Sequence, residues 1–319
     1  MNKFKNKNPK VCLLVLNWNG LRDTEECIDS LLKINYNNSE IVIIDNGSKD
    51  GSVDFFRKKY DNKIKIISNS KNLGYSGGFN SGIDYSVSQK FDYTLTMSND
   101  LIVDSEFVGK LVSVAESNDN VGIVTGKSYY YGTKQKILQR TARRSSKFFL
   151  VGSHIGVDEV DIGQCDQIKE YDYVDDVFWL LSNKALKKVG GYDAENFFFM
   201  GEELDLIYRI RREGFRVFYT PHSVVWHKVN SSLGGRIYDS KSKSPKKSKS
   251  NLMHYMYARS QMIIFYRRHL PHFHLFFYLL YNTFIHLPYN TFQLFRDKDF
   301  QRAKSLWQGY KRGILWEFK

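Results

Sequence analysis

The sequence predicts an α/β protein with a mostly parallel sheet and helices on both of its faces. Through the first half of the chain, apolar runs of four to six residues alternate with segments whose apolar residues have helical spacing. This alternation is typical of parallel strands joined by crossover helices. Polar residues follow each apolar run, and the carboxyl ends of such strands are where ligands bind. The fold class therefore also indicates where a functional site should lie.

The first strand is expected at Val11–Leu16, a continuous apolar run that predicts burial on both faces of the sheet. The next strands are expected at Ile41–Ile44, Ile64–Ile67 and Tyr93–Met97. Helical spacing predicts helices between these strands, over residues 22–34, 52–60 and 78–89.

The pattern is less regular over residues 127–173. A helix over 202–213 is expected to end near Gly214, because glycine commonly follows the last helical turn. The other elements expected in this half are a strand at Val174–Leu181, a helix over 183–189, and short strands at Val217–Tyr219 and Val224–Trp226. We therefore predict a main domain over 1–235, a basic linker or loop over 236–250, and an amphipathic, aromatic-rich helical region over 251–319.

The net charge of +13 is concentrated near the end of the chain. Residues 236–319 hold 16 Lys and Arg against 4 Asp and Glu, whereas residues 1–235 hold 31 against 30. This asymmetry indicates a polyanionic partner, either nucleic acid or an anionic membrane surface. From residue 251 onward the chain also holds 18 of its 49 aromatic residues, set among Leu and Ile at helical spacing. That pattern favours a membrane interface and argues against nucleic acid.

The apolar run over residues 273–287 is interrupted by polar residues and ends at Pro288. It is shorter than the roughly 20 apolar residues that cross a bilayer, so we expect it to lie in the membrane interface. Five lysines between positions 241 and 249 would add salt-sensitive adhesion to anionic lipid. The alternative is that these helices pack on the main domain or on a second subunit.

The three cysteines, Cys12, Cys27 and Cys165, have no metal-ligand or redox spacing. We expect them to be buried thiols in a reducing compartment. The first apolar run is shorter than the core of a signal peptide and has no small-residue cleavage site after it. The expected location is therefore cytoplasmic, peripheral at the inner face of the cell membrane.

Polar residues follow four successive predicted strands. They are Asn17–Gly20, Asp45–Asp50, Asn72–Gly82 and Ser98–Asp100. Any one of them could be only a polar turn or a helix cap. Four on one edge of one sheet indicate a ligand site. The glycines do not form the dinucleotide fingerprint, which directly follows the first strand.

These motifs together resemble the inverting glycosyltransferases of family 2, closest to their rhamnosyltransferase-like branch. The resemblance covers roughly residues 10–230. It rests on Val15–Gly20, Ile43–Ser48, Asn72–Asn80, Ser98–Asp100, Gly190–Asp193, Met200–Leu206 and Val225–His227. It implies the GT-A nucleotide-diphosphosugar transferase fold. It also implies transfer of rhamnose or another hexose from a nucleotide-diphosphate sugar to a lipid-linked or polysaccharide acceptor in cell-surface polysaccharide biosynthesis.

The resemblance assigns the donor site to the polar strand ends. Asp45 would accept a hydrogen bond from the imide N–H of a pyrimidine base. The expected donor-binding residues are Leu16, Asn17, Asn19, Asp45, Asn72, Gly77, Asn80, Asn99 and Asp100. A divalent cation, Mn²⁺ or Mg²⁺, would stabilise the departing diphosphate. Its expected ligands are Asp100 and His227, because Ser98 occupies the first position of the family's Asp-x-Asp motif.

The expected general base is Glu203, with Glu202 as the second candidate. The family usually has Glu-Asp at this place, and Glu203 stands where the aspartate would be. Glutamate has similar acidity and one more methylene, so it could perform the same chemistry. Acids in a first helical turn also simply favour the helix dipole. Asp205 and Arg209, four residues apart, are expected to form a pair on one helix face.

Two other functions compete with the transferase. A nucleotidyltransferase that makes nucleotide sugars would need a basic, Gly-rich loop after the first strand, which Asn17–Gly20 does not provide. A catalytically decayed binding or scaffold protein is favoured only by the departures at Ser98 and Glu203.

Overall fold

The chain folds around one large mixed sheet, as the sequence predicts. A computed structural model describes residues 8–136, 138–140, 142–146, 150–228, 237–239, 244–246 and 262–318. Within these residues, the sheet has the strand order β10-β13-β6-β12-β4-β1-β2-β3, with β5 on β13 and β7 on β6. Its strands are β1 (Val11–Asn17), β2 (Ser39–Asp45), β3 (Lys65–Ser68), β4 (Tyr93–Ser98), β5 (Leu101–Val103), β6 (Val121–Tyr130), β7 (Leu138–Arg140), β10 (Lys169–Glu170), β12 (Phe178–Ser182) and β13 (Arg216–His227).

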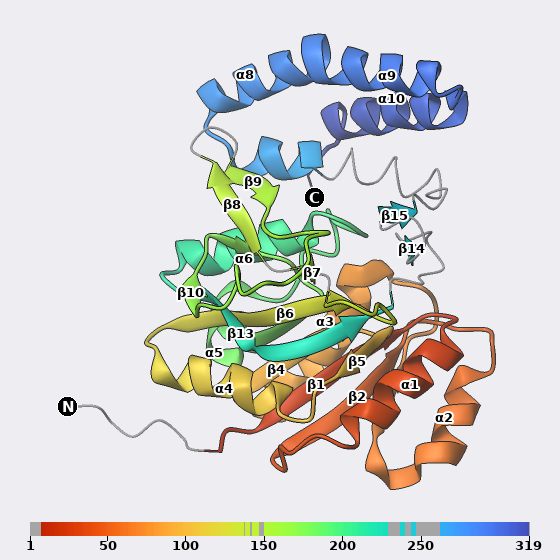
Figure 1. Ribbon diagram of the computed structural model, residues 1–319, viewed down its shortest axis with the longest axis vertical. Coiled ribbons are helices and arrows are strands. Elements are labelled where there is room, and N and C mark those ends of the chain that lie inside the picture. The colour runs from red at the N-terminus through yellow and green to blue at the C-terminus, as the bar shows by residue number, and fades with distance from the viewer. Residues whose placement is uncertain are drawn as a thin grey trace.

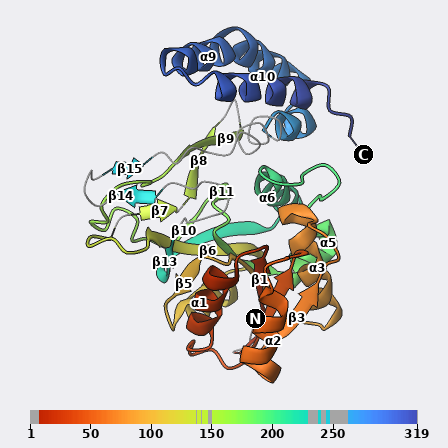
Figure 2. The same cartoon turned by 90° about the vertical axis from the view of Figure 1, so that its right-hand side faces the viewer.

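Each face of the sheet carries its own apolar core, because alternate residues of the buried strands point to opposite sides. On β1, Leu14 joins the core under α3, α5 and α6, whereas Leu13 joins the core under α1, α2 and α4. Figures 1 and 2 show these helices around the sheet. Their bounds are α1 (Leu21–Leu31), α2 (Ser52–Tyr60), α3 (Gly74–Ser88), α4 (Phe107–Ser117), α5 (Asn183–Val189) and α6 (Glu202–Arg212); a 3₁₀ turn, η1 (Asp61–Lys63), follows α2.

The sheet departs from a parallel arrangement at β12, which runs antiparallel to both β4 and β6. The expected single strand Val174–Leu181 is wrong: the structure has β11 (Tyr173–Val174) and then β12, with Asp175 and Asp176 between them. The two strands expected at Val217–Tyr219 and Val224–Trp226 are one strand, β13, whose register with β6 shifts between Thr220 and Val224. A second sheet, β11-β8-β9, uses β8 (Ala142–Ser146) and β9 (Leu150–His154).

The C-terminal region is helical and begins by packing on the main domain. Residues 262–269 are helical, and Ile263, Ile264 and Phe265 are fully buried in the core that α6 shares. The remaining elements are α8 (His272–Tyr281), the π-helix η2 (Asn282–His286), α9 (Leu287–Arg296) and α10 (Phe300–Ile314). Figures 1 and 2 show α8, α9 and α10 as a layer on the far side of β8 and β9 from α1 and α2. Among the described residues, this region therefore packs on the main domain, which is one of the arrangements expected from the sequence.

Helical backbone continues through Pro288, over residues 272–296. Proline has no N–H and its ring clashes with the carbonyl four residues before it. The π-helical turn directly before α9 widens the backbone there, as such insertions do.

None of the described helices is long and apolar enough to cross a membrane. In the predicted linker, β14 (Ile237–Asp239) pairs with β15 (Ser244–Lys246), and the other lysines expected to bind lipid lie outside the described residues.

Candidate functional site

The carboxyl ends of the central strands meet at one edge, and the strand register aligns their polar residues. Asn17 at the end of β1 is paired with Asp45 at the end of β2, and Leu16 is paired with Ser98 at the end of β4. Asp45 is in turn paired with Ser68 at the end of β3. The four polar strand ends predicted from the sequence therefore lie side by side.

Asp45 is held in place by Asn17, whose side chain is fully buried. The Asn17 amide nitrogen donates to Asp45 Oδ1 at 2.9 Å and to Ser52 Oγ at 2.9 Å. Its amide oxygen accepts from the hydroxyl of Thr24 at 2.9 Å. The backbone N–H of Ser48 donates to the other Asp45 oxygen at 3.0 Å. Asn17 thus orients the Asp45 carboxylate, and its own contact with a donor stays a prediction.

Several other predicted donor residues also have contacts within the protein. Asn72 Oδ1 accepts from the Asn46 amide at 3.0 Å, and Asn99 donates to Thr24 Oγ1 at 2.8 Å. Asn19 has a positive φ of 51° and accepts from the N–H of Lys49 at 2.8 Å. These bonds connect the strand-end loops to one another. They make the edge a rigid frame, as a preformed nucleotide site requires.

Glycines let α3 approach this edge closely. A Cβ atom on Gly78 would lie 2.6 Å from Leu16 Cδ1 at the end of β1, whereas one on Gly77 would lie 2.8 Å from Leu73 Cβ, at the start of α3 itself. Asn80 lies further along α3 and faces the other way, where it accepts from the N–H of Tyr192 and donates to the Tyr192 carbonyl, both at 2.8 Å. Asn80 therefore fixes the Gly190–Asp193 segment, and its predicted role at the donor is untested.

Asp100 and His227 are brought together by the pairing of β5 with β13, which sets His227 opposite Leu101. His227 Nε2 lies 3.0 Å from Asp100 Oδ1. Burial alone would raise the pKa of the Asp100 carboxyl, but His227 and then Lys228 hold that pKa below its usual value. Neighbouring ligands of an octahedral cation at about 2.1 Å are about 3 Å apart. The charged carboxylate and this imidazole therefore fit one edge of a Mg²⁺ or Mn²⁺ coordination shell.

A group of three acids lies beside this edge: Asp176, Glu202 and Glu203 have carboxylate oxygens within 4.8 Å of one another. Asp176 is at the edge because β12 runs antiparallel to β4, and the N–H of Ser98 donates to the carbonyl of Val177 at 3.1 Å. The segment that precedes β12 thus connects the acids of α6 to the end of β4. Such a group can bind a cation or abstract a proton.

Glu202 and Glu203 have different environments although they are adjacent on α6. The Glu202 side chain is buried, and among the described residues its Oε2 has no hydrogen-bond partner. Burial, followed by the nearby Glu203 and Asp176 carboxylates, raises the pKa of Glu202 well above its usual value. Glu203 is more exposed, and its Oε2 accepts from the N–H of Gly201 at 2.7 Å. Of the two residues, Glu202 is therefore the one whose environment favours the protonated form.

Arg143 and His154, from the small sheet, lie against Asp175, the residue before this acid group, and the sequence pattern identified neither. Arg143 Nε lies 3.2 Å and His154 Nδ1 lies 3.0 Å from the Asp175 carboxylate. Arg143 Nη2 is also 3.8 Å from Glu203 Oε1. Both residues lie in the stretch 127–173, where the pattern is irregular. Asp175 and Asp176 could have been found from their polarity inside an apolar run.

Comparison with known proteins assigns the chain to the same family that its sequence motifs resemble. The model of the family described as "Glycosyl transferase family 2" matches residues 11–189. The chain belongs to glycosyl transferase family 2. This family 2 protein is 22% identical over 231 residues to a poly-β-1,6-N-acetyl-D-glucosamine synthase of Staphylococcus aureus (strain COL), and 22% identical over 233 residues to one of Staphylococcus epidermidis. Each match covers 70% of this chain and 51% of the relative, so the chain spans about half the length of these curated relatives.

The fold of this family 2 chain is also similar to a crystal structure of GalNAc-T7 with UDP, GalNAc and Mn²⁺. The TM-score is 0.57 at 15% identity, with 81% of this chain and 50% of that chain covered. At this identity the likeness concerns the fold alone, which is the GT-A fold. The resemblance to the rhamnosyltransferase-like branch stays a prediction.

Proposed function

We propose that this family 2 glycosyltransferase transfers a sugar from a nucleotide-diphosphate donor to an acceptor hydroxyl, with inversion at the anomeric carbon. One observation carries the proposal: a donor edge and an acid group are contiguous. Asp45 ends β2 and Asp100 lies two residues after the end of β4, and these two strands flank β1 in the sheet. Val177 connects this edge to Asp176, beside Glu202 and Glu203. A displacement reaction needs this combination of a held leaving group and a base on one side.

The proposed donor is a uridine diphosphate sugar. The oriented Asp45 carboxylate suits the imide N–H of a pyrimidine base. The relatives synthesise poly-β-1,6-N-acetyl-D-glucosamine, and the similar structure holds UDP. UDP-N-acetylglucosamine is therefore the first donor to test, with the thymidine diphosphate sugar of rhamnose as the alternative from the sequence motifs.

The proposed cofactor is a divalent cation, Mn²⁺ or Mg²⁺, bound by Asp100 and His227 together with the donor's phosphates. The charge of Asp100 and the 3.0 Å spacing of the pair support this choice. A cation there would stabilise the negative charge of the departing diphosphate. The acid group of Asp176, Glu202 and Glu203 is left for the acceptor.

The proposed base is Glu203. Its carboxylate takes the proton of the acceptor hydroxyl, the hydroxyl oxygen bonds to the anomeric carbon, and the bond from that carbon to the diphosphate oxygen breaks. Glu202 is the second candidate, because burial and the neighbouring carboxylates raise its pKa and favour the protonated form, which cannot accept a proton. In this role Glu203 substitutes for the usual aspartate of the family, with one more methylene.

A panel of nucleotide sugars tests the donor assignment. With Mn²⁺ present, we expect UDP-N-acetylglucosamine or another pyrimidine nucleotide sugar to raise the melting temperature, because a ligand at 100 times its Kd stabilises by about 2.7 kcal/mol. Guanosine and adenosine diphosphate sugars serve as controls and should have no effect. Slow release of the sugar to water should accompany binding. Stabilisation by purine donors alone, or by none of the panel, would contradict the proposal.

The proposed acceptor is a lipid-linked saccharide or growing glycan at the cytoplasmic face of a membrane. A stripe of exposed apolar side chains runs along α8, η2 and α9 at intervals of three and four residues. It comprises Phe273, Phe276, Phe277, Leu280, Tyr281, Phe284, Ile285, Tyr289, Phe292 and Phe295. Exposed basic residues follow it at Arg296, Lys298, Lys304 and Lys311. An aromatic stripe with bases nearby suits the surface of an anionic bilayer.

Flotation with anionic liposomes tests this orientation. We expect the full-length protein to float at low salt and to sediment at high salt, because the basic contribution is screened. Replacing Phe273, Phe284 and Phe292 with serine should abolish flotation without unfolding, since these side chains are 69%, 71% and 65% exposed. The matched control is Ile162→Ser, which removes an 86% exposed side chain outside the helical region. If the triple variant floats like the wild type, the stripe does not bind membrane.

A further inference from the structure

The buried carboxylate of Asp205 connects the helix of the proposed base to the C-terminal region. Asp205 lies on α6 two residues after Glu203, and its side chain is 0% exposed. Arg209 Nε donates to Asp205 Oδ2 at 2.7 Å, which is the helix-face pair expected from the sequence. His269 Nε2 lies 2.7 Å from Asp205 Oδ1, and Arg268 Nη1 lies 3.5 Å from it. A buried carboxylate requires such partners, so its position is tied to theirs.

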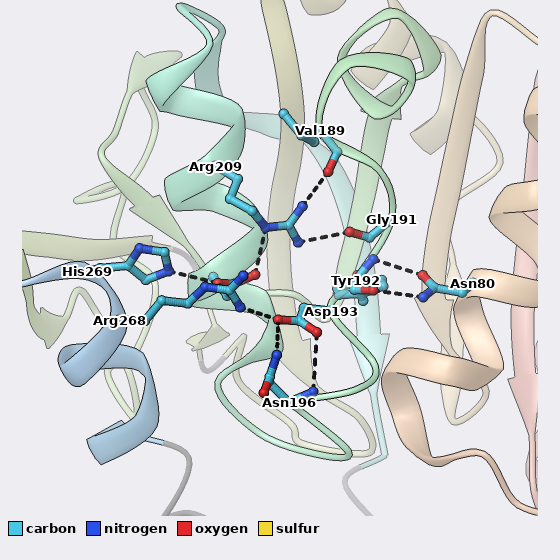
Figure 3. A network of polar contacts seen from close by, with 10 residues as sticks. Asn80, Val189, Gly191, Tyr192, Asp193, Asn196, Arg209, Arg268 and His269 are labelled. Carbon is cyan, nitrogen blue, oxygen red and sulfur yellow. Dashed lines mark hydrogen bonds and ion pairs between the residues drawn. The ribbon is translucent and has the colours of Figure 1, made fainter. Parts of the chain in front are cut away.

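On the side of the main domain, Arg209 extends the same network. Its two terminal nitrogens donate to the carbonyls of Val189 at 2.8 Å and of Gly191 at 2.9 Å. The next residue, Tyr192, is held on both its backbone groups by Asn80 of α3. Figure 3 shows Arg209 between these carbonyls on one side and the C-terminal residues on the other. This side of α6 is therefore fixed to α3 and to the end of α5.

On the other side, the C-terminal residues reach both α6 and the loop that leads into it. Arg268 pairs with Asp193 as well as with Asp205, and Asp193 also accepts from the Asn196 amide at 2.8 Å. Figure 3 shows Arg268 and His269 entering this network from the helix over residues 262–269. Further along the chain, the indole N–H of Trp316 donates to Asn196 Oδ1 at 3.3 Å. The segment between Gly190 and α6 is thus held from the C-terminal region at several points.

His269 is itself locked by packing. Its ring centroid lies 4.2 Å from that of Tyr208 and 5.1 Å from that of Phe265. The same turn of α6 carries the other contacts that matter here: the N–H of Asp205 donates to the carbonyl of Gly201 at 3.1 Å, and the N–H of Gly201 donates to Glu203. The contacts that fix Asp205 therefore also fix the backbone from which the Glu203 side chain projects.

We propose that His269 and Arg268 are positioning residues for Glu203, so that the C-terminal region completes the catalytic centre as well as lying at a membrane. The inference rests on the proposed function, in which Glu203 is the base. Neither residue touches the reacting atoms: both act through Asp205 and the first turn of α6. Displacement of a catalytic group by about 1 Å can lower a rate by a factor of about 100.

The test is a set of substitutions at these two positions. His269→Phe keeps a ring between Tyr208 and Phe265 but removes the nitrogen that faces Asp205. We expect kcat to fall by a factor of about 10 to 100, while the KM for donor and its calorimetric affinity change less than about threefold, because Asp45 and Asp100 are untouched. Arg268→Gln should act in the same direction. His269→Gln, which retains a side-chain nitrogen donor, should recover most of the activity.

Two controls match these substitutions. His272→Phe is the same replacement at an exposed position of the same region, and Arg57→Gln on α2 removes an exposed arginine that pairs only with Asp54 among its described contacts. Both should leave kcat unchanged. Loss of activity in these controls as large as in His269→Phe would overturn the inference, because the effect would then not depend on the contacts with Asp205.

Hydrogen exchange provides a readout that does not depend on activity. In His269→Phe, amides 203–206 of α6 should exchange faster by a factor of about 10 or more, while those of α1 and α3 stay as in the wild type. Unchanged protection of α6 overturns the inference whether or not the wild type transfers sugar. An active wild type with normal kcat in His269→Phe overturns it too. An inactive wild type with deprotected α6 would overturn the transferase proposal and leave the physical link between the C-terminal region and α6 supported.

Discussion

Replacing Glu203 with glutamine is expected to reduce turnover by a factor of about 10² to 10⁴, which is the range that general-base catalysis contributes. A glutamine side chain is too weak a base to take the acceptor's proton. Its amide oxygen can still accept from the N–H of Gly201, as Glu203 Oε2 does at 2.7 Å, so the first turn of α6 should keep its shape. Donor affinity by calorimetry should stay within about twofold. Initial rates of sugar transfer measure the loss.

Glu202→Gln is the matched control, because it makes the same chemical change one residue earlier. Glu202 is buried and its pKa is raised well above its usual value, which favours the neutral, protonated form that an amide resembles. We expect its turnover to stay within about tenfold of the wild type. If Glu202→Gln loses more activity than Glu203→Gln, the roles of the two residues are reversed.

Much of the fold was predictable because its first half has simple physical patterns. Strand β1 has a continuous apolar run since both faces of the sheet are covered, and the helix over 52–60 and that over 183–189 occur where their spacing predicts. The errors fall where tertiary pairing overrides local pattern. The polarity of Asp175 and Asp176 inside an apolar run is visible in the sequence. The antiparallel return of β12 beside β4 is not, because a sequence pattern contains no information about strand direction.

The candidate site was predictable to a different degree on its two sides. The register of β1, β2 and β4 brings the polar strand ends together, as the parallel alternation implied. The acid group and its neighbours were only half identified. Glu202 and Glu203 were recognisable as motif residues, whereas Arg143, His154 and His269 come from segments distant in sequence and without a regular pattern. Their proximity depends on the small sheet and on the packing of the helix over residues 262–269 against the main domain.

Asp100→Ala is expected to lower metal-dependent donor affinity at least about 100-fold, since even the outer partners of a metal site contribute about 10 to 100-fold. The substitution removes the buried carboxylate, whose lowered pKa keeps it charged at neutral pH. It leaves Asp45 and its hydrogen bonds in place, so the weak binding that remains should no longer respond to Mn²⁺. Calorimetric titration of donor, with and without Mn²⁺, measures both quantities.

His227→Ala should have a smaller effect, about tenfold, because a water molecule can take the place of one ligand. The matched control is His222→Ala, an exposed histidine on the same strand, β13, which should bind donor like the wild type. The order of the effects is the informative result: Asp100→Ala largest, His227→Ala intermediate and His222→Ala none, with activity lost in excess chelator and restored by Mn²⁺. Full activity in chelator would remove the metal from the proposal. The acid group of Asp176, Glu202 and Glu203 would then have to act with the protein's own cations, of which Arg143, 3.8 Å from Glu203, is placed to take part.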